Sequence, residues 1–410
     1  MSDRPVEELE RALYGGELDG RLAALRALCQ TAEPRDRRGT NLHIHTNESF
    51  SVFRSPTEAV AQAAGEGVVA FGINDHYTVA GHEEFRRACE VARLPATFSL
   101  EAVAMDREAE RSGARLNDPS NPGRVYLCGK GVTNYPSEDS DAARSLARMR
   151  GAVAARSRAM NEKMRALFRK RVGAEGPSWE DVLALTPRGN ATERHVARAA
   201  FGRARQVGPD AVATLCGAAA PAGDNAVAQN FIRAKLLKAG TPCFVAEDAD
   251  AFLPTEAMRD LFLAFGAIPT YPVLADPVTE GERDLEALVG RLASIRIHAL
   301  EVIPGRNTRE RLAAVVSAAR ARHIPLFSGT EHNTPEAKPL LDAFMLDPEF
   351  ESWFERSACV LLGHQAEAGA GQPGFVNARG TPTMHDARAR FKHFERAGRE
   401  ARERIESVAD

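Results

Sequence analysis

Apolar runs and amphipathic segments alternate along the first third of the chain. Three apolar runs end at His45, Ile73 and Glu101, and each has the length of a buried strand. The segments between them, which begin near Ser55 and Glu83, have the spacing and start signals of helices. This order predicts βαβ units and a parallel sheet. In such a sheet, functional side chains gather at the carboxyl ends of the strands.

A second region of the same kind lies closer to the C-terminus, separated from the first by a helical stretch. The βα pattern stops near Ser137 and resumes near Ala267, and the residues between are rich in Ala and Arg with helical spacing. We therefore predict a sheet domain whose two parts flank a helical insertion. The predicted boundaries are 1–37 for an N-terminal helical segment, 38–135 and 262–380 for the sheet domain, 136–261 for the insertion and 381–410 for a C-terminal helix.

The composition is that of a globular protein in a reducing compartment. The chain has 410 residues, of which 44% are hydrophobic and 27% charged, and its formal net charge is −3. It therefore lacks the basic excess that is typical of non-specific nucleic-acid binding. No apolar run approaches the roughly 20 residues of a membrane span, and the six cysteines form no CxxC pair. We expect a cytoplasmic protein with no membrane partner and no strong nucleic-acid signal, and the oligomeric state stays open.

The ends of the predicted strands carry candidate metal ligands. His43 and His45 are separated by one residue, so both imidazoles lie on the same face of an extended strand. Asp75 and His76 follow the second strand, and Glu101 ends the third, where an unpaired buried carboxylate would be costly. Imidazoles and carboxylates delivered to one edge of a sheet indicate a metal centre, and therefore an enzyme.

These motifs, together with three later ones, resemble the PHP (polymerase and histidinol phosphatase) family. In chain order, the matching stretches are His43-Ile44-His45, Asn74-Asp75-His76-Tyr77-Thr78, Leu100-Glu101, Thr192-Glu193-Arg194-His195-Val196-Ala197-Arg198, Val273-Leu274-Ala275-Asp276-Pro277 and Ser328-Gly329-Thr330-Glu331-His332-Asn333-Thr334-Pro335. Each is weak alone, but six in the family's order, over about residues 38–335, are specific. The resemblance is strongest to PHP phosphoesterases with a helical insertion that act on nucleotide or short oligonucleotide phosphates. It implies an α/β fold, a distorted, TIM-like (β/α)7 barrel, with up to three metals and a small-molecule substrate.

The resemblance implies one metal site with a complete set of ligands. A divalent transition metal, Zn, Mn or Fe, would bind there tightly. Its ligands would be His43, His45, Glu101 and Glu331, with Glu331 standing where the family has an aspartate. His76 matches the histidine of the second family motif and is expected to be a further ligand near this site.

The other family ligand positions depart from the pattern. Tyr126 stands at one histidine position, and Asp276 at another could hold a second ion or cap a helix. A third position falls on Phe50 or Ser51, and the final histidine is replaced by Asn333. We therefore expect fewer metals than the family maximum.

The resemblance also implies catalytic and substrate-binding residues. His195 matches the histidine of the insertion's R-x-H-x-A-R motif, and Arg194 is shifted by one place from the motif's first arginine. Both, with His76, are expected to be catalytic. The expected substrate contacts are Arg198, Lys235, Lys130, Asn333 and His332. Lys130 could instead be solvated, and a shift of one residue could exchange the roles of His332 and Asn333. Glu193 stands where the family has an arginine and would repel a phosphate, although neighbouring cations could compensate.

Three functions stay open at this point. The favoured one is a metal-dependent hydrolase, with a phosphoesterase as its most natural form, in which the metal activates water. The second is a metal-dependent lyase, isomerase or amide hydrolase acting on a non-phosphate substrate, which Glu193 and the reduced metal set favour. The third is a non-catalytic binding protein, against which the complete ligand set of the first metal argues.

Overall fold

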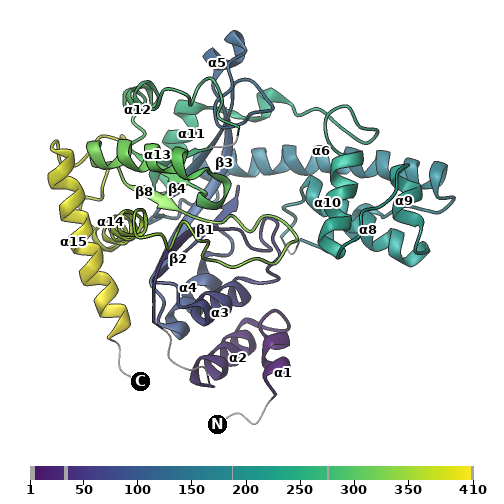
Figure 1. The fold of residues 1–410 in the computed structure, drawn as a ribbon, viewed down its shortest axis with the longest axis horizontal. Coiled ribbons are helices and arrows are strands. Elements are labelled where there is room, and N and C mark those ends of the chain that lie inside the picture. Colours follow the sequence, from purple (N-terminus) through teal and green to yellow (C-terminus); the bar gives the residue numbers. More distant parts are fainter. Residues whose placement is uncertain (1–4, 32–35, 187, 275–276, 408–410) are drawn as a thin grey trace.

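The apolar segments of the sequence form one sheet that curls into a nearly closed barrel (Figure 1). The computed structural model describes residues 5–31, 36–186, 188–274 and 277–407. The strand order is β1-β2-β3-β4-β6-β7-β8, and β5 pairs with β3 outside this path. The strands are β1 (Thr40–Ile44), β2 (Ala70–His76), β3 (Ala96–Met105), β4 (Arg124–Lys130), β5 (Leu253–Pro254), β6 (Ile268–Val273), β7 (Ala299–Val302) and β8 (Leu326–Ser328). A parallel bridge between Ile44 and Glu331 joins the two ends of the sheet.

One strand runs against the direction of its neighbours. β4 is antiparallel to β3 and β6, whereas the other neighbouring pairs along the path are parallel. The ladder with β4 continues along β3 to Met105, so the prediction that this strand ends at Glu101 was wrong. Glu101 lies inside β3, opposite Cys128 of β4. The extra length comes from pairing partners, which the local sequence pattern does not encode.

Helices cover the outside of the barrel and bury its apolar side chains. They are α3 (Pro56–Glu66), α4 (His82–Ala92), α11 (Thr255–Ala264), α12 (Leu285–Ser294), α13 (Arg309–Arg322) and α14 (Glu351–Gly369), with α1 (Val6–Ala12), α2 (Leu18–Thr31) and α5 (Arg107–Ser112) at the periphery. The side chain of Ser55 caps α3 by accepting a hydrogen bond from the backbone N–H of Glu58. α15 (Ala387–Glu406) packs closely on α14, where a Cβ atom on Gly398 would lie 1.8 Å from Cys359 O. The predicted α/β barrel is confirmed.

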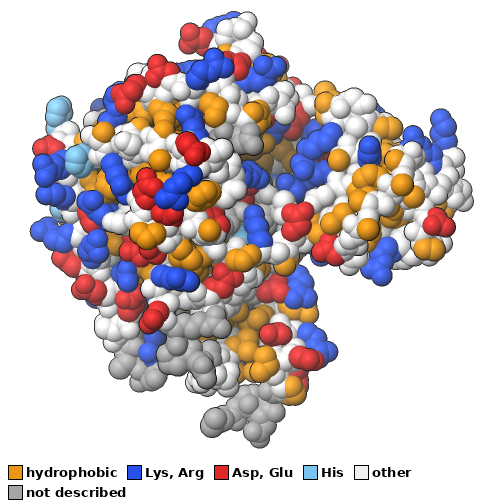
Figure 2. Space-filling model, in the orientation of Figure 1, with side chains coloured by type: hydrophobic (Ala, Val, Ile, Leu, Met, Phe, Trp, Pro, Cys, Tyr) orange, Lys and Arg blue, Asp and Glu red, His pale blue; other side chains and the backbone are white. Residues whose placement is uncertain are grey.

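Five helices of the range predicted for the insertion form a lobe beside the barrel (Figure 1), whereas β5 and the start of α11, which also fall in that range, belong to the barrel. The helices of the lobe are α6 (Asp141–Arg171), α7 (Trp179–Leu183), α8 (Glu193–Val207), α9 (Ala211–Cys216) and α10 (Asn225–Leu236). This lobe has a hydrophobic core of its own, which includes Met164, Phe168 and Leu215. Figure 2 shows Lys and Arg side chains on the visible face where the lobe meets the barrel. None of the described helices combines the length and the apolarity needed to cross a membrane.

Candidate metal centre

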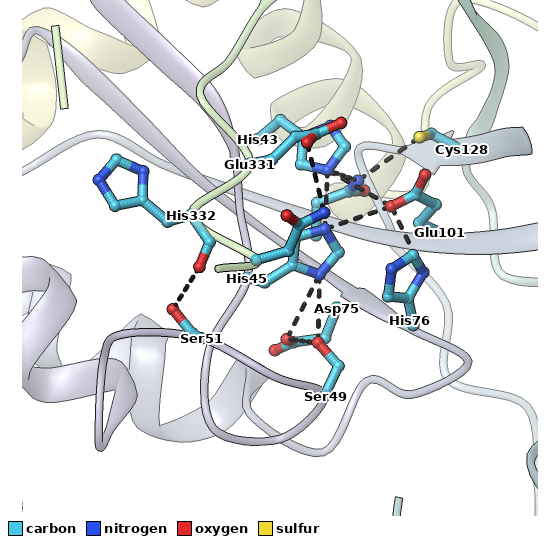
Figure 3. A network of polar contacts seen from close by, with 12 residues as sticks. His43, His45, Ser49, Ser51, Asp75, His76, Glu101, Cys128, Glu331 and His332 are labelled. Carbon is cyan, nitrogen blue, oxygen red and sulfur yellow. Dashed lines mark hydrogen bonds and ion pairs between the residues drawn. The ribbon is translucent and has the colours of Figure 1, made fainter. Parts of the chain in front are cut away.

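Two histidines and one glutamate converge inside the barrel (Figure 3). His43 Nε2 and His45 Nε2, from the end of β1, lie 3.1 Å apart. Glu101 Oε2, from β3, lies 3.5 Å from the first and 3.3 Å from the second. Two donors about 2 Å from a tetrahedral ion are themselves about 3.3 Å apart. These three buried donors therefore have the spacing that a single transition-metal ion requires.

His76 adds a fourth donor on the open side of this group. Its Nδ1 lies 3.4 Å from Glu101 Oε2, and its ring centroid lies 4.5 Å from that of His45. Nδ1 is buried and has no hydrogen-bond partner among the described residues. The side chain as a whole is 23% exposed. An unpartnered nitrogen that faces a carboxylate in this way fits a metal ligand.

Burial and neighbouring charges set the protonation of these groups. Burial lowers the pKa of His45 and of His76 to about 4, so both imidazoles are neutral at neutral pH. Burial alone would raise the pKa of Glu101, but the surrounding histidines hold it well below its usual range. Burial would also lower the pKa of His43, yet Glu301 outweighs this and raises it to about 9. A metal ion that binds here would displace a proton from His43.

Glu301 and Cys128 lie beneath the pair of histidines and were not predicted. Glu301 Oε2 lies 2.9 Å from His43 Nδ1 and accepts a hydrogen bond from Cys128 Sγ at 3.3 Å. His43, Cys128 and Glu301 thus form a second group of potential donors. The sequence offered one signal for Glu301: its carboxylate lies within the apolar strand Ala299–Val302, and such a group is costly to bury without a partner.

Asp75 positions His45 through a serine. Its carboxylate accepts hydrogen bonds from the backbone N–H and the hydroxyl of Thr46, at 2.8 and 2.6 Å, and from the Ser49 hydroxyl at 2.5 Å. Ser49 Oγ lies 3.1 Å from His45 Nδ1. Because this contact fixes the Nδ1 side of the ring, Nε2 faces Glu101.

The backbone of Glu331 is bonded to the histidine strand, but its carboxylate points elsewhere. Its N–H donates to His43 O at 2.8 Å, and its C=O accepts from His45 N–H at 2.7 Å. Its carboxylate instead forms an ion pair with Arg306 at 2.6 Å and accepts from the amide of Asn333. The structure thus leaves Glu331, a predicted ligand, outside the group of converging donors. Its backbone has a φ of 63°, a conformation that costs a non-glycine residue energy.

Two further predicted site residues have other partners, and one cannot be placed. His332 points away from the histidine group (Figure 3), and both of its ring nitrogens are bonded, to Thr330 Oγ1 at 2.7 Å and to Lys338 O at 3.0 Å. Such a ring has no nitrogen left for a substrate. Lys130 is fully buried and paired with Glu301, because the antiparallel β4 carries its carboxyl end to the opposite edge of the sheet. Asp276 lies outside the described residues.

The first turn of α8 brings basic and aromatic groups to the rim of the centre. Arg194 donates to Asn333 Oδ1 at 3.4 Å and lies over the ring of Phe50 at 5.8 Å, with no ion pair among the described residues. Burial lowers the pKa of Arg194 to about 10, so it stays charged near neutral pH. The ring of His195 packs edge-on against Phe50. Arg198 is half-buried, and in the described chain no hydrogen bond or ion pair engages it.

Glu193 of the lobe is paired in a way that the sequence did not predict, whereas the substrate contact of Lys235 stays a prediction. Glu193 is bonded to Arg233 and Lys238, each at 2.6 Å, and lies 3.6 Å from Arg156. Although burial would raise the pKa of Glu193, these cations lower it to about 2. Its charge is therefore neutralised, so it repels a phosphate far less than expected. Lys235 is exposed and lies over the ring of Phe231.

The burial of Glu48, in the loop after β1, leads us to predict that the stability of the protein depends on pH. Burial, with a smaller contribution from Asp75, raises its pKa from 4.5 to about 7. The folded state therefore binds this proton more tightly, and the stability that it gives is lost as the pH rises from about 4.5 to 7. Glu48→Gln should then stabilise the protein at pH 8 by on the order of 2–3 kcal/mol and change little at pH 4. Urea unfolding of both proteins in chelator measures this, with the exposed Glu108→Gln as control. An equal difference at the two pH values would contradict it.

Comparison with known proteins identifies the fold. No model of a known protein family matches the sequence, and comparison with curated proteins also gives no match. A structure from Bifidobacterium adolescentis, provisionally assigned as a metal-dependent phosphoesterase, is 19% identical, with a TM-score of 0.52 over 78% of this chain and 97% of that one. An amidohydrolase from Chromobacterium violaceum, solved with bound sulfate and no metal, is 16% identical, with a TM-score of 0.52 over 77% of this chain and 95% of its own. At this level of identity the similarity concerns the barrel fold.

Proposed function

We propose that the protein is a metal-dependent hydrolase of PHP type that cleaves a small phosphorylated substrate. The observation that carries this proposal is a buried donor set with metal-ligand spacing beneath an arginine that forms no ion pair with any described residue. His43, His45 and Glu101 supply the donors, and Arg194 supplies the cation. A half-buried guanidinium without a carboxylate is costly, and an anionic substrate would provide the missing partner.

The metal and the residues around it would have distinct roles. A bound divalent ion would supply Lewis acidity and lower the pKa of water near the substrate. His43, His45 and Glu101 would hold it, with His76 on the exposed side. Within the described chain, the spacing of these donors supports one tightly bound ion.

Arg194 and His195 would bind the substrate's anionic group. His195 Nδ1 accepts a hydrogen bond from the backbone N–H of Thr192 at 3.1 Å. The proton of the neutral imidazole therefore lies on Nε2, which becomes a donor. Burial lowers the pKa of His195 to about 3, so the ring stays neutral while it donates. A guanidinium and an imidazole N–H on one helix turn suit the oxygens of a phosphoryl group.

A non-phosphate substrate is the second candidate. One structural neighbour is an amidohydrolase, although it was solved with sulfate, a tetrahedral anion shaped like a phosphoryl group. In addition, the carboxylate of Glu331 is held by Arg306 instead of joining the donors. A reduced donor set of this kind suits a metal-dependent amide hydrolase, lyase or isomerase as well as a phosphoesterase.

Release of inorganic phosphate decides between the two candidates. We expect the protein, supplied with Mn²⁺ or Zn²⁺, to release phosphate from at least one of a panel of nucleotides, sugar phosphates and an aryl phosphate. Chelation should abolish the activity and added metal should restore it, because the metal supplies the activated water. A preparation that holds metal but releases phosphate from none of these compounds would reject the phosphoesterase and favour a non-phosphate substrate.

A further inference from the structure

A charged pair lies inside the barrel beneath the metal centre. Lys130 and Glu301 form an ion pair, and both side chains have an exposed fraction of 0%. Lys130 Nζ also donates to Leu42 O at 3.0 Å, which fixes the ammonium next to β1. Neither side chain reaches the rim where a substrate would bind. Burying two charges is expensive even when they are paired, so such a pair calls for an explanation.

Glu301 links this pair directly to a metal-binding histidine. One carboxylate oxygen, Oε1, contacts Lys130 Nζ, and the other, Oε2, lies 2.9 Å from His43 Nδ1. Oε2 also accepts a hydrogen bond from the thiol of Cys128. On the far side of the same imidazole, His43 Nε2 faces His45 and Glu101, and the side-chain amide of Asn74 lies 2.9 Å from it. The carboxylate and the metal donors therefore lie at opposite nitrogens of one ring.

We propose that Glu301, held by Lys130, is a positioning residue that sets the orientation and tautomer of His43 for the metal. With its Nδ1–H donated to Glu301, His43 presents the lone pair of Nε2 to the ion. Lys130 balances the buried carboxylate, so Glu301 remains an ionised acceptor. This inference rests on the proposed metal-dependent function, and it assigns a role to two residues that do not contact the metal or the substrate.

The same residues could instead hold a second ion, since His43, Cys128 and Glu301 lie within 4.8 Å of one another. Two contacts argue against this. The ammonium of Lys130 already occupies one oxygen of Glu301, and the thiol of Cys128 donates to the other. A metal cation would thus have to enter beside a fixed, buried ammonium, which is electrostatically unfavourable. The group is better explained as a support for His43.

The test compares metal affinity with stability in Glu301→Gln, Lys130→Met and the double variant. Affinity is measured by titrating metal-free protein with Zn²⁺, and stability by urea unfolding in chelator. Glu301→Gln should bind the ion about 10–100-fold more weakly. Lys130→Met keeps the Glu301 carboxylate beside His43. This variant should therefore be less stable, but its Zn²⁺ affinity should change less than that of Glu301→Gln. The double variant should recover part of the stability while its affinity stays low, which a purely structural role would not produce.

Three other outcomes separate the positioning role of Glu301 from the metal site itself and from a second ion. If the unaltered protein binds no Zn²⁺, the proposed function itself fails. If it binds Zn²⁺ and Glu301→Gln binds equally tightly, the positioning role is rejected while the metal centre stands. Two ions in the unaltered protein and one in Cys128→Ser, with thiolate-to-metal charge-transfer absorption when Co²⁺ is used, would show that Glu301 is a ligand of a second ion. One ion in both proteins would support the proposal.

Discussion

Glu101→Gln should release most of the bound metal and lower kcat/KM by more than about 100-fold. Glu101 Oε2 lies within 3.5 Å of ring nitrogens of His43, His45 and His76, so it is the donor that the whole group shares. A glutamine keeps the size of the side chain but loses the negative charge that offsets the metal. No comparable carboxylate from the described residues reaches all three rings.

Metal content and phosphate release, or turnover of whichever substrate is found, measure this effect. The matched control is Glu108→Gln, because Glu108 is exposed on α5, away from the site. It should leave both quantities unchanged. A Glu101→Gln protein that folds, keeps its metal and stays active would remove Glu101 from the centre.

Arg194→Ala should lower kcat/KM on a phosphate ester by roughly 100-fold or more, a few kcal/mol of transition-state stabilisation. Arg194 faces the rim, and among the described residues its side chain has Asn333 as its one hydrogen-bond partner, so its charge is available to a substrate. Arg194→Lys should recover only part of the loss, since a lysine has the charge without the planar fork of donors. Metal content should stay unchanged, because Arg194 is not a ligand.

Arg205→Ala is the control for this variant. Arg205 lies on the same helix, is exposed, and contacts Asn225 and the ring of Phe201 within the lobe. Its replacement should leave kcat/KM within about twofold, as for most surface positions. Equal effects of the two variants would indicate that Arg194 acts through the stability of α8. No effect of Arg194→Ala would reject its contact with the substrate.

The sequence predicted the parallel pairing and the converging histidines because both follow from strand geometry, whereas closure into a barrel was implied by the resemblance to the PHP family. Alternation along a strand places His43 and His45 on one face, and parallel pairing brings His76 and Glu101 to the same level. Strand direction has no such local signature, so the antiparallel β4 was missed. Lys130 was therefore predicted to lie at the rim, whereas it lies in the interior of the barrel.

The rest of the site depends on side chains that are distant in the sequence. Glu301 meets His43 across 258 residues, and no motif around Glu301 indicates its partner. The carboxylate of Glu331 is drawn away by Arg306, which follows a different strand. A family pattern can assign Glu331 to a metal, but only the placed side chains reveal the competing ion pair. The role of Glu331 as a ligand therefore stays a prediction.

If His43, His45 and Glu101 hold a divalent transition metal, the metal content of the protein depends on these side chains. The measurement is the metal content of protein purified without chelator, compared with His45→Ala purified in the same way. We predict about one tightly bound ion per chain in the first and little in the second, because losing one imidazole from a small donor set removes most of its affinity. No metal in the unaltered protein, or the same content in both, would contradict this assignment.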